Sequence, residues 1–219
     1  MKVYFISGLG ANEKIFQRIQ LPEGFEPVYL NWINPLNDET FESYARRLAQ
    51  QIESGTDFIL IGLSLGGMIA VEMNKFLAPK LTILISSAVN KNELSSWTLF
   101  LGILGISNLI TERMYHTNSF YTDNFLGIKS VEDHALQKEM LSKAPIEFFH
   151  WAIPKIVRWQ NEFIPERLLR IHGTKDKIIP FKNAEGIIAI KDGTHFMVFN
   201  RANEINKILS EELPAAIER

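Results

Sequence analysis

Residues 57–68 read DFILIGLSLGGM, in which an apolar run enters the pattern Gly-x-Ser-x-Gly at Gly62, Ser64 and Gly66 and an apolar segment leaves it. The run before the pattern predicts a buried strand, and the segment after it is too apolar for a surface helix. In a strand-turn-helix of this kind the serine occupies a tight, strained turn that exposes its hydroxyl at the carboxyl end of the sheet. We therefore predict that Ser64 is a nucleophile, with the NH of Leu65 at the helix start facing any negative charge that develops.

Apolar runs and helical periodicity alternate along most of the chain, a pattern typical of a parallel sheet built from β-α-β units. Most of these runs are continuous rather than alternating, so we expect helices to cover both faces of the sheet. The sequence predicts an α/β fold with a doubly wound, mostly parallel sheet of about six strands. The expected strands, in chain order, are residues 2–6, 26–31, 57–63, 81–87, 168–172 and 185–190.

Two helices are marked most clearly in the first half of the chain. Residues 37–40 form the helix-start signal Asn-Asp-Glu-Thr, apolar side chains follow at three- and four-residue spacing from Phe41 to Ile52, and Gly55 marks the end. The second helix is expected at residues 65–77. Its apolar composition indicates that it is buried against the sheet.

The alternation stops in the middle of the chain. The segment there is rich in aromatic residues, lacks the rhythm of β-α-β units, and contains Pro145 and Pro154 as punctuation. We interpret residues 91–160 as a helical cap inserted between two strands of a core formed by residues 1–90 and 161–219. Its aromatic side chains fit either the inner face of a helical layer or a substrate pocket, because apolar pockets are lined by the same residue types.

A serine hydroxyl is a weak nucleophile until a base takes its proton, so a histidine and a carboxylate are needed elsewhere in the chain. His195 follows the last expected strand and Asp176 follows the fifth, which places both in loops at the carboxyl edge of the sheet. Asp192 is nearer to His195 in sequence, but a carboxylate three residues away on the same loop is badly placed to reach the far ring nitrogen. We therefore predict Ser64 as nucleophile, Asp176 as acid and His195 as base.

Three segments together resemble the motifs of the α/β-hydrolase superfamily. Residues 62–66, GLSLG, look like its nucleophile elbow, residues 172–180, HGTKDKIIP, like its acid loop, and residues 193–195, GTH, like its histidine loop. The resemblance extends over roughly residues 1–90 and 165–212. A serine at the elbow sets the chain apart from the branches that use an aspartate nucleophile, the epoxide hydrolases and haloalkane dehalogenases.

The resemblance also implies an α/β-hydrolase fold with an oxyanion loop after the first strand, at residues 6–10. The NH of Leu9 would be the second hydrogen-bond donor of this loop, beside that of Leu65. Many members have His-Gly in the loop, where this chain has Ser7-Gly8.

These observations predict a serine hydrolase that cleaves a carboxylic ester or thioester of a small to medium hydrophobic acyl group through an acyl-enzyme. We place the substrate pocket at Trp97, Phe100 and Leu101, in an uncharged stretch of the cap. An acyltransferase or a lyase using the same triad is one alternative. A ligand-binding receptor without turnover is another, because a fold does not determine a function.

The composition of the chain limits the classes of partner and cofactor that we expect. The 219 residues include 23 Lys and Arg against 25 Asp and Glu, a formal net charge of −2, which does not favour nucleic acid or an anionic membrane surface as the main partner. The chain has no cysteine, which excludes disulfides, a thiolate nucleophile and cysteine-based metal sites. The histidine spacings match no zinc site. We expect a cytoplasmic protein without metal or cofactor.

Two remaining sequence patterns bear on whether the chain has a membrane span or a dinucleotide site. Residues 94–111 carry no charge and reach the lower limit for a membrane span, but their Ser, Thr, Asn and Gly residues lower the hydropathy, so we expect no transmembrane span. Gly8 and Gly10 begin the dinucleotide pattern Gly-x-Gly-x-x-Gly, but Glu13 occupies the third glycine position, where its charge would face a pyrophosphate. A small-molecule ester or thioester is therefore the expected partner.

Overall fold

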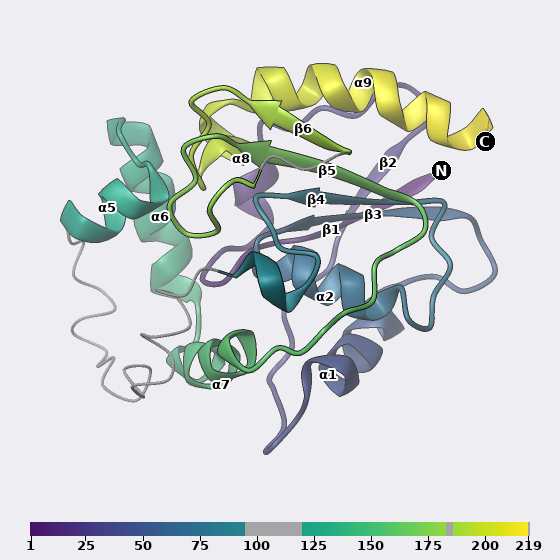
Figure 1. Cartoon of the computed structure of the whole chain (residues 1–219), viewed down its shortest axis with the longest axis horizontal. Coiled ribbons are helices and arrows are strands. Elements are labelled where there is room, and N and C mark those ends of the chain that lie inside the picture. Colours follow the sequence, from purple (N-terminus) through teal and green to yellow (C-terminus); the bar gives the residue numbers. More distant parts are fainter. Residues whose placement is uncertain (95–119, 183–185, 219) are drawn as a thin grey trace.

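The computed structural model describes residues 1–94, 120–182 and 186–218. Its centre is a six-stranded, all-parallel sheet with the strand order β2-β1-β3-β4-β5-β6 (Figure 1). The strands are β1 (Lys2–Ile6), β2 (Glu26–Tyr29), β3 (Phe58–Leu63), β4 (Leu81–Ile85), β5 (Leu168–Gly173) and β6 (Ile187–Ile190). The predicted α/β fold class and the number of strands are confirmed.

Helices cover both faces of this sheet. One face is covered by α1 (Phe41–Leu48) and α2 (Leu65–Met73), and the other by α8 (Met197–Asn200), α9 (Ala202–Glu218) and the 3₁₀ turn η1 (Glu13–Phe16). Successive residues of a strand point to opposite faces, so neighbouring apolar residues enter different cores. This two-sided burial explains why most of the strands are continuous apolar runs, whereas the edge strand β2 (EPVY) is largely exposed.

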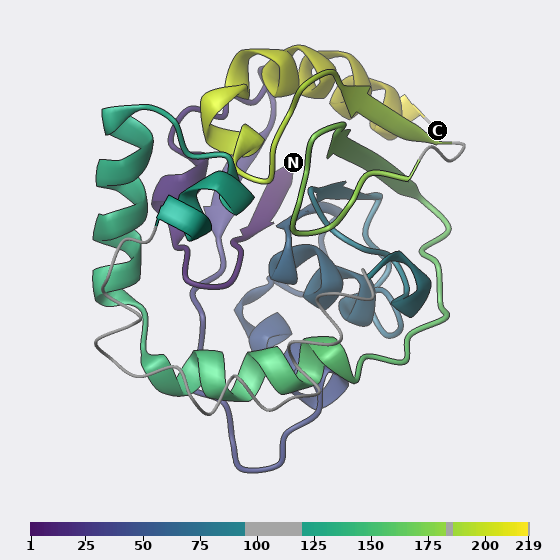
Figure 2. The same ribbon diagram turned by 60° about the vertical axis from the view of Figure 1, so that its left-hand side comes forward.

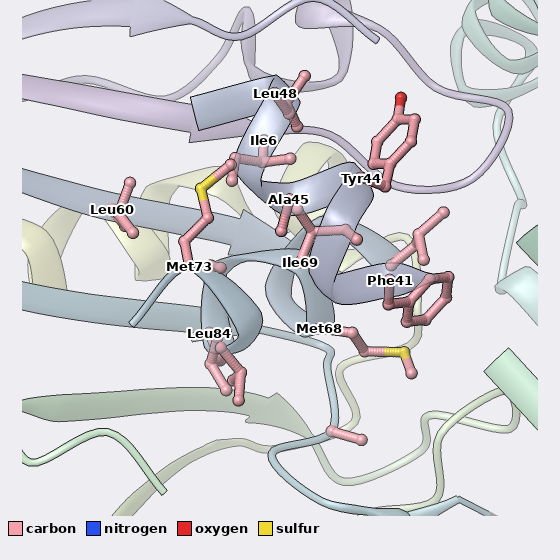
Figure 3. Close-up of a cluster of buried hydrophobic side chains, with 14 of the residues drawn as sticks. Ile6, Phe41, Tyr44, Ala45, Leu48, Leu60, Met68, Ile69, Met73 and Leu84 are labelled. Atoms are coloured by element: carbon pink, nitrogen blue, oxygen red, sulfur yellow. The ribbon is translucent and has the colours of Figure 1, made fainter. Parts of the chain in front are cut away.

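The core under α1 and α2 illustrates the packing (Figure 3). Ile6, Leu60 and Leu84 extend from three neighbouring strands toward Ile69 and Met73 of α2, and each of the five is at most 1% exposed. Burying an aliphatic side chain of this size contributes roughly 1.5–3 kcal/mol. Helix α2 is therefore held along its whole length by the sheet, as its apolar composition predicts.

Several element ends differ from the prediction. Strand β2 ends at Tyr29 rather than at residue 31, because its pairing with β1 ends at Phe5. Strand β4 ends at Ile85 rather than at residue 87, because Ser86 has a left-handed φ of 46° that turns the chain out of the sheet.

The two predicted helices are also shorter than expected. Helix α1 ends at Leu48 and tightens into the 3₁₀ turn η2 (Ala49–Gln51), as the last turns of helices often do. Helix α2 ends at Met73, because the next side chain, Asn74, bonds back to Ala70 O at 2.8 Å and to Thr82 Oγ1.

Between β4 and β5 the described chain contains no strand but the turn η3 (Lys91–Glu93) and the helices α5 (Phe120–Leu126), α6 (Val131–Lys143) and α7 (Ile146–Val157). The helical character expected for this segment is found in its described part, and its division from the core as a cap stays a prediction. Figures 1 and 2 show α5, α6 and α7 along the edge of the molecule where the strands end.

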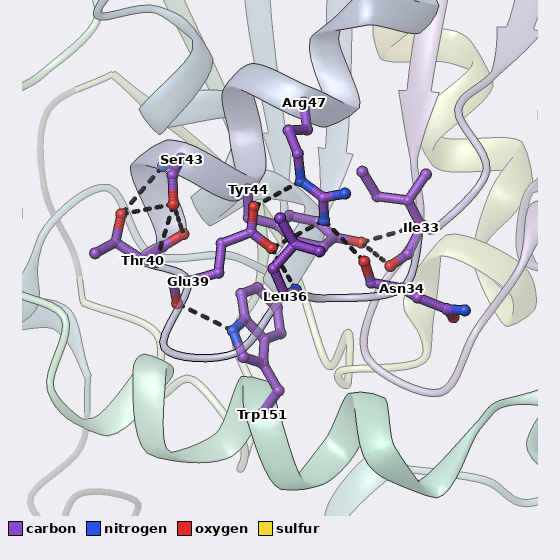
Figure 4. Close-up of polar contacts among 9 residues, drawn as sticks. All are labelled: Ile33, Asn34, Leu36, Glu39, Thr40, Ser43, Tyr44, Arg47 and Trp151. Atoms are coloured by element: carbon purple, nitrogen blue, oxygen red, sulfur yellow. Dashed lines mark hydrogen bonds and ion pairs between the residues drawn. The ribbon is translucent and has the colours of Figure 1, made fainter.

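Helix α7 is fixed to the core through the loop before α1 (Figure 4). Trp151 donates its indole NH to Glu39 O at 3.0 Å, and the buried Glu39 carboxylate accepts two bonds from Arg47 at 2.7 and 2.9 Å. Burial would raise the pKa of Glu39, but the hydrogen bonds from Arg47 and from the NH of Leu36 outweigh it and lower the pKa. This ionised pair ties the loop to which Trp151 bonds to Arg47 of α1.

Within the part of the chain that the structure describes, no helix has both the length and the apolar character needed to cross a membrane.

Candidate active site

Ser64 lies in the turn between β3 and α2, beside the point where the strand order reverses between β1 and β3. In an open parallel sheet this reversal is where ligands bind, beyond the carboxyl ends of the strands. The backbone of Ser64 has φ 52° and ψ −119°, an unfavourable conformation for a residue with a side chain. Strain of this kind is found mostly at functional sites, where the surrounding structure enforces it.

The surrounding glycines enforce this turn by close backbone approach. A Cβ on Gly66 would lie 2.2 Å from Ile6 O, and a Cβ on Gly62 would lie 2.4 Å from the Cα of Gly67. Neither neighbour is the end of a flexible side chain, so neither can move aside. The pattern Gly-x-Ser-x-Gly is therefore a packing requirement of the turn that presents Ser64.

The structure brings together the three residues predicted from the sequence. Ser64 Oγ lies 2.9 Å from His195 Nε2, and His195 Nδ1 lies 2.8 Å from Asp176 Oδ2. Asp176 is 5% and His195 8% exposed. An ionised carboxylate can only accept, so Nδ1 carries the imidazole proton of the neutral ring and Nε2 is free to accept from the Ser64 hydroxyl.

The carboxylate of Asp176 is held by more than His195. Its Oδ1 accepts bonds from the NH groups of Ile178 and Ile179 at 2.9 and 3.0 Å. Burial would raise the pKa of Asp176, but the electrostatic interaction with His195 and the hydrogen bonds from His172 and His195 outweigh it and hold the pKa well below its usual range. Asp176 therefore stays ionised at neutral pH despite its burial.

Two polar residues that the sequence reasoning passed over support this arrangement. His172 is buried, with Nε2 2.8 Å from Ile179 O and 3.5 Å from Asp176 Oδ2. Ser87 is buried beside the turn of Ser64 and donates from Oγ to Ser64 O at 2.7 Å. His172 lies near the end of β5 and Ser87 follows the end of β4, and this position at the carboxyl edge of the sheet is the signal that could have found them.

Asp192, the rejected alternative for the acid, points away from the imidazole. Its carboxylate is exposed and pairs with Lys175 at 2.7 Å, and this pairing lowers its pKa.

The loop after β1 lies directly beside Ser64. A Cβ on Gly8 would be 3.4 Å from the Cβ of Ser64, and the loop is closed by a bond of 2.9 Å from Ser7 Oγ to Ala11 O. Leu9 lies within this loop, and Leu65 is the first residue of α2, so its NH has no acceptor inside the helix. The role of these two NH groups as oxyanion donors stays a prediction.

The expected pocket residues Trp97, Phe100 and Leu101 lie outside the described residues. Within the described part of the insertion, α6 and α7 contact the loop after β1. A Cβ on Gly10 would lie 2.6 Å from Phe149 Cζ and 3.0 Å from a methyl carbon of Leu141. Among the described residues, no group of three or more His, Cys, Asp or Glu side chains is placed to hold a metal ion.

Known structures share this architecture although their sequences differ. An esterase from Thermogutta terrifontis, crystallised with malate, is 14% identical to this chain; the match covers 99% of this chain and 90% of the other, with a TM-score of 0.77. A putative lipase from Acinetobacter baumannii is 16% identical, with coverages of 99% and 83% and a TM-score of 0.70. An epoxide hydrolase from Bacillus megaterium is 11% identical, with coverages of 100% and 93% and a TM-score of 0.69.

No protein-family model and no curated protein sequence matches this chain. The structural matches nevertheless cover nearly the whole molecule, and all three are proteins of one fold. The chain has the α/β-hydrolase fold, and the expected resemblance is confirmed at that level.

Proposed function

We propose that this protein is a serine hydrolase that cleaves a carboxylic ester or thioester of a small to medium hydrophobic acyl group. The observation that carries the proposal is the hydrogen-bonded row from Ser64 Oγ through His195 to Asp176, with distances of 2.9 and 2.8 Å. Nucleophile, base and orienting carboxylate within hydrogen-bond reach are the arrangement that activates a hydroxyl for acyl transfer.

The proposed reaction has two halves. His195 Nε2 takes the proton of Ser64 as Oγ attacks the carbonyl carbon, and the resulting imidazolium gives this proton to the leaving alcohol or thiol. Water then attacks the acyl-serine with His195 again as base, which releases the acid and restores Ser64. Throughout, Asp176 keeps the ring oriented through Nδ1 and stabilises its positive charge.

Charge that develops on the carbonyl oxygen needs donors already in place. We assign this role to the NH groups of Leu9 and Leu65, which flank Ser64 in the loop after β1 and at the start of α2. The positive end of α2 adds to the same effect. No step of this mechanism uses a metal or an organic cofactor.

The test combines covalent labelling with turnover. A fluorophosphonate probe should modify wild-type protein at Ser64, shown by mapping the modified peptide, and p-nitrophenyl esters should be hydrolysed. Replacement of Ser64 or His195 by alanine should each reduce turnover on the order of 10⁶-fold, because the triad acts as a unit. Ser142→Ala, on the exposed side of α6, is the matched control and should retain full activity.

Two results would contradict the proposal. Undiminished turnover in Ser64→Ala would mean that another group performs the reaction. Stable binding of esters without turnover would favour the receptor alternative, whether or not the fluorophosphonate probe modifies Ser64.

A further inference from the structure

The turn that ends α5, residues 124–128, lies against the loop that carries His195. Gly127 has a left-handed φ of 79°, and the NH groups of Gly127 and Ile128 both bond to Asp123 O, at 2.7 and 2.9 Å. This is the usual way in which a glycine closes the last turn of a helix. The turn is therefore a rigid unit that ends α5 at a defined place.

Both sequence neighbours of His195 contact this turn. On one side, the NH of Phe196 donates to Leu126 O at 2.9 Å. On the other side, Thr194 fills the space beside Gly127: a Cβ on Gly127 would lie 2.2 Å from both Cβ and Oγ1 of Thr194. The loop is thus bonded after the histidine and packed before it.

The same turn reaches the acid loop and the helix after His195. Asn124 Oδ1 accepts a bond of 2.9 Å from Lys177, the residue after Asp176, and Asn200 of α8 donates to Gly127 O at 3.3 Å. One short segment of the insertion therefore contacts the chain beside two of the three residues in the hydrogen-bonded row.

Position matters here because the imidazole of His195 has to meet two partners at once. Its ring nitrogens lie 2.8 Å from Asp176 and 2.9 Å from Ser64. The acid loop bonds the chain before the histidine, from Lys175 NH to Gly193 O at 2.8 Å, but loops are more mobile than the sheet and the residues on either side of His195 need contacts of their own. The contact with Thr194 is steric, since its Oγ1 is buried without a hydrogen-bond partner among the described residues.

We propose that the turn at residues 124–128 is a positioning element for His195, which fixes the imidazole in line with Ser64 and Asp176. This inference rests on the proposed hydrolase function and adds that the insertion takes part in assembling the catalytic row. It predicts that a substitution which displaces this turn reduces kcat and leaves substrate binding unchanged.

The decisive variant is Gly127→Ala, whose methyl group pushes Thr194 and with it the His195 loop. We expect kcat for a p-nitrophenyl ester to fall about 10²-fold, the loss typical of a catalytic group displaced by about 1 Å, with little change in KM. The double variant Gly127→Ala with Thr194→Gly removes the clash and should regain most of the loss. Thr194→Gly alone measures the effect of the added glycine.

A second glycine provides the control for backbone strain. Gly55 has the same φ of 79°, but a Cβ there meets nothing within 4 Å. Gly55→Ala therefore introduces the strain without the clash and should keep the wild-type kcat. Full kcat in Gly127→Ala, an equal loss in Gly55→Ala, or no recovery in the double variant would overturn the proposal.

A variant without added bulk keeps the test informative should Gly127→Ala fail to fold. Lys177→Ala combined with Asn200→Ala removes both side-chain bonds to the turn, and a reduced kcat at unchanged KM is expected. Wild-type kcat in this variant would overturn the proposal.

Failure of the proposed function would look different, because wild-type protein would then neither hydrolyse esters nor react with fluorophosphonate. The positioning of the loop is in that case measured by hydrogen exchange of the Phe196 amide, which donates to Leu126 O. Faster exchange in Gly127→Ala than in Gly55→Ala supports the positioning role, and equal exchange contradicts it.

Discussion

The carboxyl edge of the sheet and the insertion beside it are packed in different ways. In the sheet, the critical contacts join backbone to backbone: a Cβ on Gly66 would meet Ile6 O at 2.2 Å, and one on Gly173 would meet Gly193 O at 2.3 Å. In the insertion, the bond from the NH of Phe196 to Leu126 O joins backbone to backbone, but the close-packed contacts beside the site run through side chains. The ring of Phe149 covers Gly10, and Thr194 fills the space at Gly127.

This difference separates what is fixed from what can change. Backbone contacts leave no freedom for substitution, so the turns that present Ser64 and His195 tolerate only glycine at their close approaches. Side-chain contacts can be altered in size and shape while the backbone stays in place. We infer that the sheet determines which residues carry out the proposed reaction. The insertion adjusts the position of His195 and the choice of acyl group.

The largest effect that distinguishes the two candidate acids should come from Asp176→Asn. It removes the carboxylate that orients His195, and we expect turnover to fall about 10⁴-fold. Asp192→Asn is the matched control, since that side chain is exposed and pairs with Lys175, and it should keep near wild-type turnover. Steady-state kinetics of both variants measure this, and a larger loss in Asp192→Asn would contradict the assignment.

The sheet could be predicted from the sequence because local pattern and long-range packing agree there. Most of the six strands were marked by continuous apolar runs, and Ser64, Asp176 and His195 each follow an expected strand, which placed them at the carboxyl edge. The strand ends could not be predicted as well. Ser86 turns the chain by adopting a left-handed backbone that its residue type does not signal.

The insertion was predictable only in its helical character. Helix α6 begins with an ordinary helix signal, the capping box at Ser130 and Asp133. The contacts of the insertion with Gly10 and the His195 loop join residues more than 60 positions apart, and no periodicity reports such distances. His172 was missed for a related reason, because a histidine bonded to a backbone carbonyl looks in sequence like any buried histidine.

The pH dependence of turnover tests whether protonation of His195 or of Asp176 reduces activity at low pH. The pKa of Asp176 is held well below its usual range, so this carboxylate is ionised above about pH 4, where an unperturbed aspartate titrates. Only neutral imidazole accepts the Ser64 proton, so kcat/KM should rise about tenfold per pH unit on the acid side and then level off. Activity that persists unchanged to pH 4 would exclude His195 as the base.

The smallest expected effect concerns acyl selection by the insertion. Each methylene of an acyl chain buried against apolar side chains contributes roughly 0.8 kcal/mol, which is about fourfold in kcat/KM. Phe149 lies against Gly10, next to the proposed donor Leu9, so its ring is placed to contact an acyl group held there. In a series of p-nitrophenyl esters, kcat/KM should therefore rise from acetyl to longer acyl groups.

Phe149→Ala should flatten this rise while leaving the rate for the acetyl ester nearly unchanged, because the short acyl group does not reach the ring. Phe163→Ala is the matched control: this phenylalanine is 40% exposed and follows the insertion, and its loss should leave the whole series as in the wild type. The expected pocket residues Trp97, Phe100 and Leu101 are tested in the same way. If the series peaks at acetyl, or if none of these variants changes the dependence on chain length, the insertion does not select the acyl group and its aromatic residues serve packing alone.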